Sequence, residues 1–233
     1  MRGAENTFDI DKARELVGNP VLWPCVRDFL WDFAPQVHAS WLANVCGRET
    51  SDERRDADVL HVARLASHPR VRRFVLEQLG VEPCFHDFPK DDGSRLLLLD
   101  GETLLEMAKW LGALACAENL RKVTDGKSVK ALKSEFAGVY PEVFGYTAYF
   151  DLAAENAKSA KAAGEICTCG FEILFSVVSA LPASLVARLK FKLPRKLCDI
   201  CGLCGKKERL TSYSAILKLL KLKFPEAYSL CCS

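Results

Sequence analysis

The chain has 233 residues, of which 49% are hydrophobic and 27% are charged, and its formal net charge at pH 7 is +2. This composition is typical of a folded protein and excludes an intrinsically disordered one. The longest uncharged run, residues 173–187, is shorter than the roughly 20 apolar residues that a membrane-spanning helix needs. Acidic side chains interrupt the N-terminal segment where a signal peptide would be apolar, so we expect a cytosolic protein without a transmembrane segment.

Helical periodicity dominates the N-terminal part of the chain. Ser51–Arg54 has the pattern of a capping box and predicts the start of a charged helix. A second helix is predicted to begin at His68-Pro69 and to end at Gly80. The residues that this second helix is expected to turn inward are Val71, Phe74, Val75 and Leu79. Residues 81–95, which contain two prolines and an Asp-Asp-Gly turn, predict a loop.

Helices also account for most of the chain after this loop. Leu96–Leu99 fits either a very short strand or an apolar lead-in to the next helix. That helix, from Leu104 to about Ala117, is apolar on almost its whole circumference, which is typical of a helix buried in a core. The further helices that the composition predicts are Val129–Phe136, Pro141 to about Ala160, and Ile166–Ala180.

The predicted fold class is all-α. Few segments combine β-branched residues with two-residue alternation, and no repeat of a length typical of solenoids is apparent. We expect residues 1–233 to form a single, compact and irregular multi-helix domain. A division into an N-terminal lobe (1–90) and a C-terminal lobe (95–233) is an alternative description. At most a very short β element is expected, at Leu96–Leu99.

A helix bracketed by two Leu-Pro corners is followed by a strongly basic segment. Pro182 suits the first turn of this helix, and Pro194 lies beyond its end. The residues that recur every four positions and therefore share one helical face are Leu185, Leu189 and Leu193. Residues 188–223 contain eleven Lys or Arg and two acids, so this segment carries +9 and the rest of the chain −7. Such polarity indicates an interaction surface rather than a reaction site.

The lysines of the last part of this basic segment are candidate partner-binding residues: Lys218, Lys221 and Lys223. They alternate with leucines, so a helix could pack its leucines on the core and direct its lysines toward an acidic protein, a nucleic acid or an anionic bilayer. A plain solvated face is the other interpretation. Few aromatic residues are available to stack on bases, so we do not expect a nucleic-acid partner. Acidic residues in segment 51–58 predict that the other end of the chain faces a different neighbour.

The eleven cysteines are an odd number without an export signal, which favours free thiols over a disulfide framework. Cys25 and Cys116 lie in apolar stretches and are predicted to be small core residues. Cys198, Cys201 and Cys204 are candidate metal ligands, because two-residue gaps allow neighbouring thiolates to converge on one ion. A second Cys pair or a His pair at suitable spacing is missing. A turn of free cysteines is therefore favoured, and we expect no metal and no cofactor.

Cys84 and His86 are the candidate residues for a thiol enzyme, because a thiol nucleophile needs a nearby base. Residues so close in sequence rarely orient productively, and a loop anchored by Phe85 and Phe88 is the favoured alternative. No HExxH motif or complete phosphate-binding loop is present. We therefore expect no catalytic residues and no enzymatic activity.

Three segments resemble the SctK family of type III secretion proteins, which is also called YscK, OrgA or MxiK. They are PQVHASWL at Pro35–Leu42, the helical segment Leu104–Gly138, and Gly170–Pro194, followed by FPEAYSLC near the end. Each is a helix-packing pattern without catalytic chemistry, and their order and spacing carry the likeness. Ala39 stands where the first segment usually has Pro, and the first thirty residues and the 198–204 cysteines do not match the family's pattern.

The resemblance implies a mostly helical, non-enzymatic adaptor of the cytosolic sorting platform. Its expected partners are the forkhead-associated-like cytosolic domain of an inner-membrane ring protein (SctD-like) and the pod protein (SctQ-like) that carries the stalk and ATPase. Its expected location is the cytoplasm, at the cytosolic face of the inner membrane. No residue role carries over from the family. Two other functions stay open from the residues alone: a nucleic-acid-binding regulator that uses the Lys-rich C-terminal segment, and a thiol enzyme at Cys84 and His86.

Overall fold

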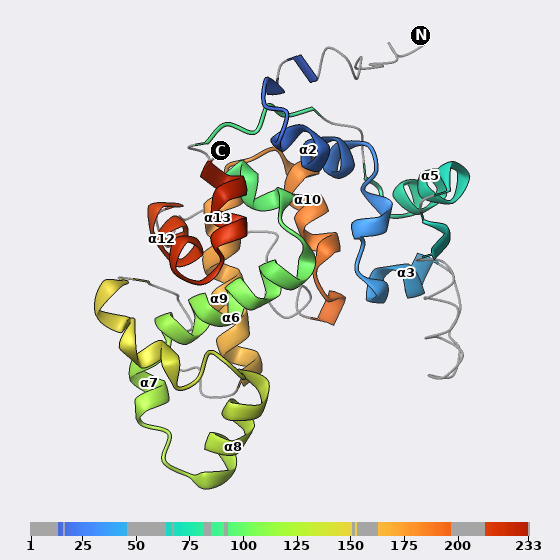
Figure 1. Cartoon of the computed structure of the whole chain (residues 1–233). Coiled ribbons are helices and arrows are strands. Elements are labelled where there is room, and N and C mark those ends of the chain that lie inside the picture. Colours follow the sequence, from blue (N-terminus) through green and yellow to red (C-terminus); the bar gives the residue numbers. More distant parts are fainter. Residues whose placement is uncertain are drawn as a thin grey trace.

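The computed structural model describes residues 14–15, 17–45, 64–66, 68–81, 85–90, 93–150, 152, 163–196 and 213–232. These residues form helices joined by short connections and contain no strand, so the fold is all-α, as predicted (Figure 1). The α-helices are α2 (Leu22–Leu30), α3 (Ala39–Val45), α5 (Pro69–Gln78), α6 (Gly101–Ala115), α7 (Ala117–Arg121), α8 (Gly126–Glu135), α9 (Ala163–Val178), α10 (Ala183–Lys192), α12 (Tyr213–Lys223) and α13 (Pro225–Cys232). The 3-10 helices are η1 (Ala34–Gln36), η2 (Ser94–Leu98), η3 (Glu142–Gly145) and η4 (Thr147–Tyr149).

Helices α6 and α9 cross in close contact at the centre of the molecule (Figure 1). The residues on the inner face of α6 are fully buried, as predicted: Leu104, Met107 and Leu111. The two backbones touch at a pair of glycines. A Cβ on Gly112 would lie 1.9 Å from the carbonyl oxygen of Ile166, and a Cβ on Gly170 would lie 1.7 Å from that of Ala108. Only a residue without a side chain permits this approach.

The predicted helix between the two Leu-Pro corners is confirmed as α10. Pro182 precedes its first residue, and the chain leaves the helix in an extended conformation at Leu193. The three leucines that the spacing placed on one face are all fully buried: Leu185, Leu189 and Leu193. The leucines that recur at helical spacing in this segment are therefore the residues that pack against the core.

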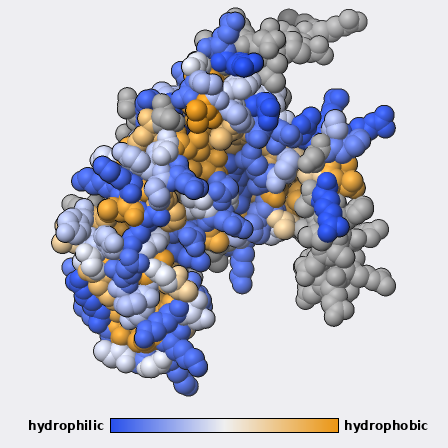
Figure 2. Space-filling view, in the orientation of Figure 1, coloured by the Kyte–Doolittle hydropathy of each residue, from blue (hydrophilic) through white to orange (hydrophobic). Residues whose placement is uncertain are grey.

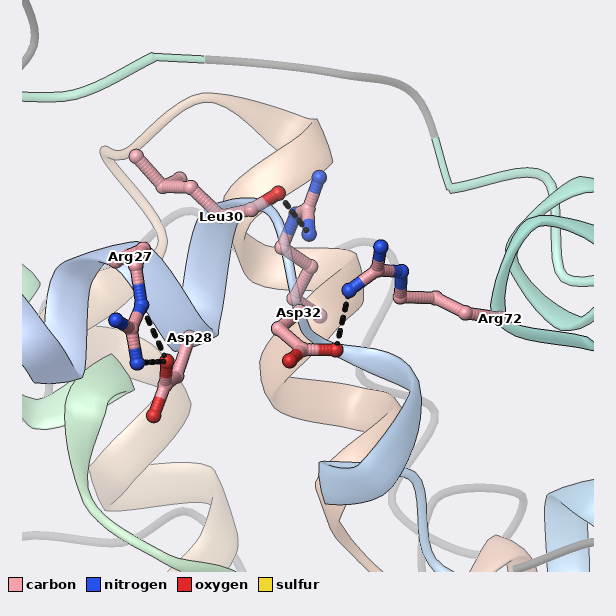
Figure 3. Close-up of polar contacts among 6 residues, drawn as sticks. Arg27, Asp28, Leu30, Asp32 and Arg72 are labelled. Carbon is pink, nitrogen blue, oxygen red and sulfur yellow. Dashed lines mark hydrogen bonds and ion pairs between the residues drawn. The ribbon is translucent and has the colours of Figure 1, made fainter. Parts of the chain in front are cut away.

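The N-terminal elements pack against the end of α10. The indole Nε1 of Trp41 donates a hydrogen bond to the carbonyl oxygen of Leu193 at 2.9 Å, and its ring meets that of Phe191 edge to face at 5.0 Å. The carboxylate of Asp32, just after α2, accepts a hydrogen bond from Arg72 of α5 at 2.7 Å (Figure 3). The contacts of Trp41 join the N-terminal part of the chain to α10, and the contact of Asp32 with Arg72 joins α2 to α5.

Of the two alternatives for Leu96–Leu99, a very short strand or an apolar lead-in to the next helix, the strand is wrong. Ser94–Leu98 forms η2 instead, and its leucines are buried. A strand would need a neighbouring strand to pair its backbone. Here the ammonium of Lys192 supplies the hydrogen-bond donors in place of a neighbouring strand, and it donates to the carbonyl oxygens of Leu97 and Leu99.

Two further details differ from the expectations. The sequence predicts a helix from Pro141 to about Ala160, but two short 3-10 helices, η3 and η4, follow Pro141, and residues 153–162 lie outside the described part of the chain. The ring of Tyr146 packs edge to face on Trp110 at 5.9 Å, and such tertiary packing overrides weak helix propensity. In α5, Val75 is buried as expected, whereas Phe74 is 50% exposed. Phe74 thus lies outside the apolar stripe of that helix.

Candidate partner-binding surface

Helix α12 exposes two of the three predicted partner-binding lysines. Lys218 and Lys221 are exposed, while the opposite side of the helix is buried at Ile216, Leu219 and Leu220. Leu222, which is 53% exposed, lies beside them because residues three and four apart share a helical face. Two lysines next to an exposed leucine fit the chemistry of an acidic protein surface.

Lys223, the third lysine, is engaged inside the molecule. Its ammonium lies 4.5 Å from the ring centroid of Trp110 and 4.3 Å from that of Tyr146, and it pairs with the carboxylate of Glu142. Burial opposes its charge, but the hydrogen bonds to Glu142 and Tyr146 outweigh this and raise the pKa of Lys223. Lys223 therefore fastens the end of α12 to α6 and η3, and we define the basic face of α12 as Lys218, Lys221 and Leu222.

Helix α10 places two cations in the core. The guanidinium of Arg188 donates hydrogen bonds to the carbonyl oxygens of Phe29 and Leu30, at 3.0 and 3.3 Å. These carbonyls belong to the last turn of α2, where no backbone donor is available within the helix. The guanidinium also lies 5.8 Å from the ring centroid of Phe29 and 5.4 Å from that of Phe33. Arg188 thus caps α2, and it belongs to the core rather than to the predicted interaction surface.

Lys192 is the second buried cation, and its side chain is surrounded by protein. Its Nζ donates hydrogen bonds to Leu97 and Leu99 at 2.7 and 2.8 Å and lies 4.8 Å from the ring centroid of Phe29. Burial lowers the pKa of Lys192 to about 7, although the nearby carboxylate of Asp100 favours the charged form. The lysine is therefore poised to lose its proton near neutral pH.

Replacing Lys192 by methionine is expected to change how stability depends on pH. The unfolded chain has an ordinary lysine pKa of about 10.4 and binds the proton more tightly than the folded chain does. Stability therefore rises with pH between about 7 and 10.4 in the wild type, through this one group.

The measurement is urea unfolding of both proteins from pH 6 to 9.5. The free energy of unfolding of the wild type should increase relative to that of Lys192→Met as the pH rises. Lys133→Met, at an exposed position, is the control, and a pH-independent difference for Lys192→Met would contradict the expectation.

A groove of about 800 Å³ opens where α2, α6 and the end of α10 meet, and we call it the α2–α10 groove. Its apolar lining residues are Pro35, Leu98, Leu105 and Pro194, and its charged lining residues are Asp28, Asp100, Glu102 and Lys192. His38 lines one end. Its Nδ1 accepts a hydrogen bond from the amide of Ser40 at 3.1 Å, and burial lowers the pKa of His38, so the imidazole is held in its neutral form.

The carboxylates of this groove are not among the predicted site residues. In the sequence, Asp100 stands out only as a residue type that caps helices, and its carboxylate does accept a hydrogen bond from the amide of Thr103 at 2.8 Å. Nothing in the spacing of Asp28 and Asp100 indicates that they line one groove. The only signal is the pair of acids, Asp100 and Glu102, at the start of an otherwise apolar helix.

Several other predicted residues lie outside the described part of the chain. These are the metal-ligand candidates Cys198, Cys201 and Cys204, the thiol candidate Cys84, and the acidic segment 51–58. His86 is described, and its ring packs edge to face on Phe88 at 5.2 Å. In the described ranges no group of three or more His, Cys, Asp or Glu is placed to hold a metal ion. The metal and thiol hypotheses depend on undescribed residues and stay predictions.

The surface is mostly hydrophilic on the face that Figure 2 shows, and hydrophobic residues appear there in separate patches. The large hydrophobic side chains that are exposed are Val21, Leu65, Phe74, Tyr149 and Leu222. Scattered exposed apolar residues are normal in folded proteins, so the charges are the more informative feature of this surface. Among the described residues no helix combines the length and the apolar character needed to cross a membrane.

A family model described as "YOP proteins translocation protein K (YscK)" matches residues 38–231 of the chain. The match begins within the segment Pro35–Leu42 and includes both Leu104–Gly138 and Gly170–Pro194. It therefore covers α10, most of the groove and the whole of α12. No curated protein and no solved structure matches the chain.

Proposed function

The chain belongs to the YscK family of type III secretion proteins, and we propose that it acts as a non-enzymatic adaptor of the cytosolic sorting platform. In this function it bridges the cytosolic domain of an SctD-like inner-membrane ring protein and an SctQ-like pod protein, at the cytosolic face of the inner membrane. The observation that carries the proposal is the family match over residues 38–231.

The internal contacts of the chain support this function. An adaptor sets the positions of two neighbours only if its binding surfaces are held on a rigid frame. Trp41 bonds to Leu193, Arg188 bonds to Phe29, and Lys223 packs on Trp110, so each contact ties together helices that are distant in the sequence. We propose on the same grounds that residues 1–233 fold as one unit.

We place one of the two partner contacts on the basic face of α12. Lys218 and Lys221 are exposed, and exposed lysines add little to stability but much to the rate and strength of association with an acidic surface. Leu222, which lies beside them on the helix, supplies an apolar contact. Lys223 is left out of this contact because its charge is already used inside the molecule.

The double substitution Lys218→Glu and Lys221→Glu is expected to weaken binding to one neighbour at least about tenfold, because it replaces attraction by repulsion at an interface. Binding to the other neighbour and the free energy of unfolding should change little, by less than about 1 kcal/mol for stability. The measurement is co-purification and calorimetric titration with the ring-protein domain and the pod protein. The matched control is Lys130→Glu with Lys133→Glu, two exposed lysines at the same spacing on α8.

Unchanged binding of the α12 variant to both neighbours would remove the basic face from the interface. A wild-type protein that binds neither neighbour would overturn the adaptor function itself. The nucleic-acid alternative is tested on the same proteins with duplex DNA, where binding through lysines would weaken steeply with salt.

A further inference from the structure

The lining of the α2–α10 groove combines carboxylates with apolar side chains. Asp100 accepts hydrogen bonds from the amide and the hydroxyl of Thr103 at 2.8 and 2.7 Å. Burial opposes its ionisation, but these hydrogen bonds outweigh burial and lower the pKa of Asp100, so its carboxylate is charged at neutral pH. Glu102 is exposed in the first turn of the same helix, and its carboxylate pairs with no other described residue. The lining of the groove therefore has two carboxylates close together at the start of α6.

The third carboxylate, Asp28, contributes less to this field. The guanidinium of Arg27 donates hydrogen bonds to it at 2.9 and 2.7 Å, and both side chains are about half exposed (Figure 3). Such a pair is nearly neutral from a distance. The carboxylates of the groove that have no guanidinium beside them are therefore Asp100 and Glu102, and the buried Lys192 carries only part of a positive charge at neutral pH.

An anionic ligand does not fit this groove. The start of a helix often binds anions through its free amides, but the side chain of Asp100 already caps the first turn of α6. The cation among the groove's described lining residues, Lys192, donates its hydrogen bonds to Leu97 and Leu99 and has a pKa of about 7. Both features are thus already directed at groups of the chain itself, which disfavours a phosphate or a carboxylate as the ligand.

We infer that the α2–α10 groove binds a basic, extended segment of a partner protein. A lysine or arginine of this segment pairs with Glu102 and Asp100, and a neighbouring apolar side chain packs on Leu98 and Leu105. The volume of about 800 Å³ is suited to a few side chains and lies in the usual range of ligand-binding pockets. In Figure 1, α12 lies at the left edge of the molecule and α10 near its centre, with α13 between them in this view, so this contact is separate from the one on the basic face of α12.

This inference deepens the adaptor function, since it gives the second neighbour a chemistry opposite to that of the first. It rests on the proposed function only for the identity of that neighbour. The chemistry of the groove can therefore be tested with synthetic peptides, whatever the result with the ring and pod proteins.

The test compares two substitutions at matched positions. Glu102 and Glu118 are both exposed acids in the first turn of a helix, in α6 and α7 respectively. Each of Glu102→Lys and Glu118→Lys removes a favourable interaction of an acid with a helix N-terminus, worth at most about 0.3–1 kcal/mol. Only Glu102 lines the groove. A third variant, Gln36→Glu, adds a carboxylate to the groove with almost no change in shape.

The probe is a fluorescent peptide that alternates leucine and arginine, with a peptide of equal length that alternates leucine and glutamate as its counterpart. Fluorescence anisotropy should show that the arginine peptide binds the full-length wild type and that Glu102→Lys weakens this binding at least about tenfold. Glu118→Lys should bind it as the wild type does, and Gln36→Glu should bind it more tightly. The glutamate peptide should bind none of these proteins more tightly than the arginine peptide.

Equal loss of binding in Glu102→Lys and Glu118→Lys would overturn the inference, because it would indicate a general electrostatic effect. Equal binding of the arginine peptide by the wild type, Glu102→Lys and Gln36→Glu would overturn it as well, as would the absence of binding to the wild type. If the peptide results hold and neither the ring-protein domain nor the pod protein binds the wild type, the groove chemistry stands and the proposed function fails.

Discussion

Gly112→Ala is expected to destabilise the protein by at least about 3 kcal/mol, at the upper end of the cost of overpacking a core. In most helices this substitution is favourable by roughly 0.5–1 kcal/mol, because glycine has the higher conformational entropy when unfolded. Here the new Cβ would lie 1.9 Å from the carbonyl oxygen of Ile166 and 2.9 Å from its carbon, so α6 and α9 must move apart. The substitution of glycine by alanine, which stabilises most helices, is therefore destabilising at this position.

The matched control for this prediction is Gly164→Ala in α9. A Cβ at Gly164 would meet no atom within 4 Å, so the ordinary helix preference for alanine should apply and the protein should gain stability. Gly170→Ala, whose Cβ would lie 1.7 Å from the carbonyl oxygen of Ala108, should be as damaging as Gly112→Ala. Urea unfolding at neutral pH measures all three. A cost below about 0.5 kcal/mol for Gly112→Ala, typical of a surface position, would refute the close crossing of the two helices.

Phe29→Ala is expected to cost about 4 kcal/mol or more, and thus to leave little folded protein. The removal of a buried phenylalanine ring alone costs about 3–5 kcal/mol. The ring of Phe29 is fully buried and meets Phe33 and Phe88 edge to face, at 5.6 and 5.8 Å. It also lies within 5.8 Å of both buried cations, Arg188 and Lys192, and a desolvated cation–π contact adds up to about 2 kcal/mol.

Phe74→Ala is the control for this prediction, since it is the same substitution at a side chain that is 50% exposed. Its cost should stay within about 1 kcal/mol. Phe29→Leu keeps apolar volume but removes the aromatic ring, and should lie between the two, because the contacts with Arg188 and Lys192 lose their electrostatic part. Thermal unfolding followed by circular dichroism distinguishes the three variants. Equal stabilities of Phe29→Leu and the wild type would show that the ring contributes only hydrophobic volume.

The sequence predicted those elements whose signals are local. The helix α10 was predictable because two prolines mark its limits and three leucines recur at helical spacing between them. The helix α6 was predictable from Leu104 onward because apolar residues cover almost its whole circumference, and the structure begins it at Gly101, directly after the cap Asp100. Leu96–Leu99 was ambiguous because four consecutive leucines show neither a helical nor a strand period, and the choice depends on tertiary partners. For this segment the deciding partner is Lys192, which is 95 positions away from Leu97.

The charges were the least predictable part of the candidate site. A pattern of Lys and Arg is normally a solvated face, and the sequence offered no reason to separate Arg188 and Lys192 from Lys218 and Lys221. Burial of the first two depends on carbonyl groups that distant helices bring to them. Lys223 is removed from the basic face in the same way, because Trp110 and Tyr146 surround its ammonium. The groove carboxylates were missed because Asp28 and Asp100 are distant in the sequence, and only the fold brings them to one groove.

Arg188, which caps α2, is synthesised long after α2 itself. Phe29 and Arg188 are 159 positions apart, and synthesis proceeds at about 5–20 residues per second. Helix α2 therefore waits on the order of 8–32 seconds for its cap. During that interval its apolar face, Leu22, Val26 and Phe29, has no α10 to cover it. During synthesis this face therefore stays without its native cover until α10 has emerged from the ribosome.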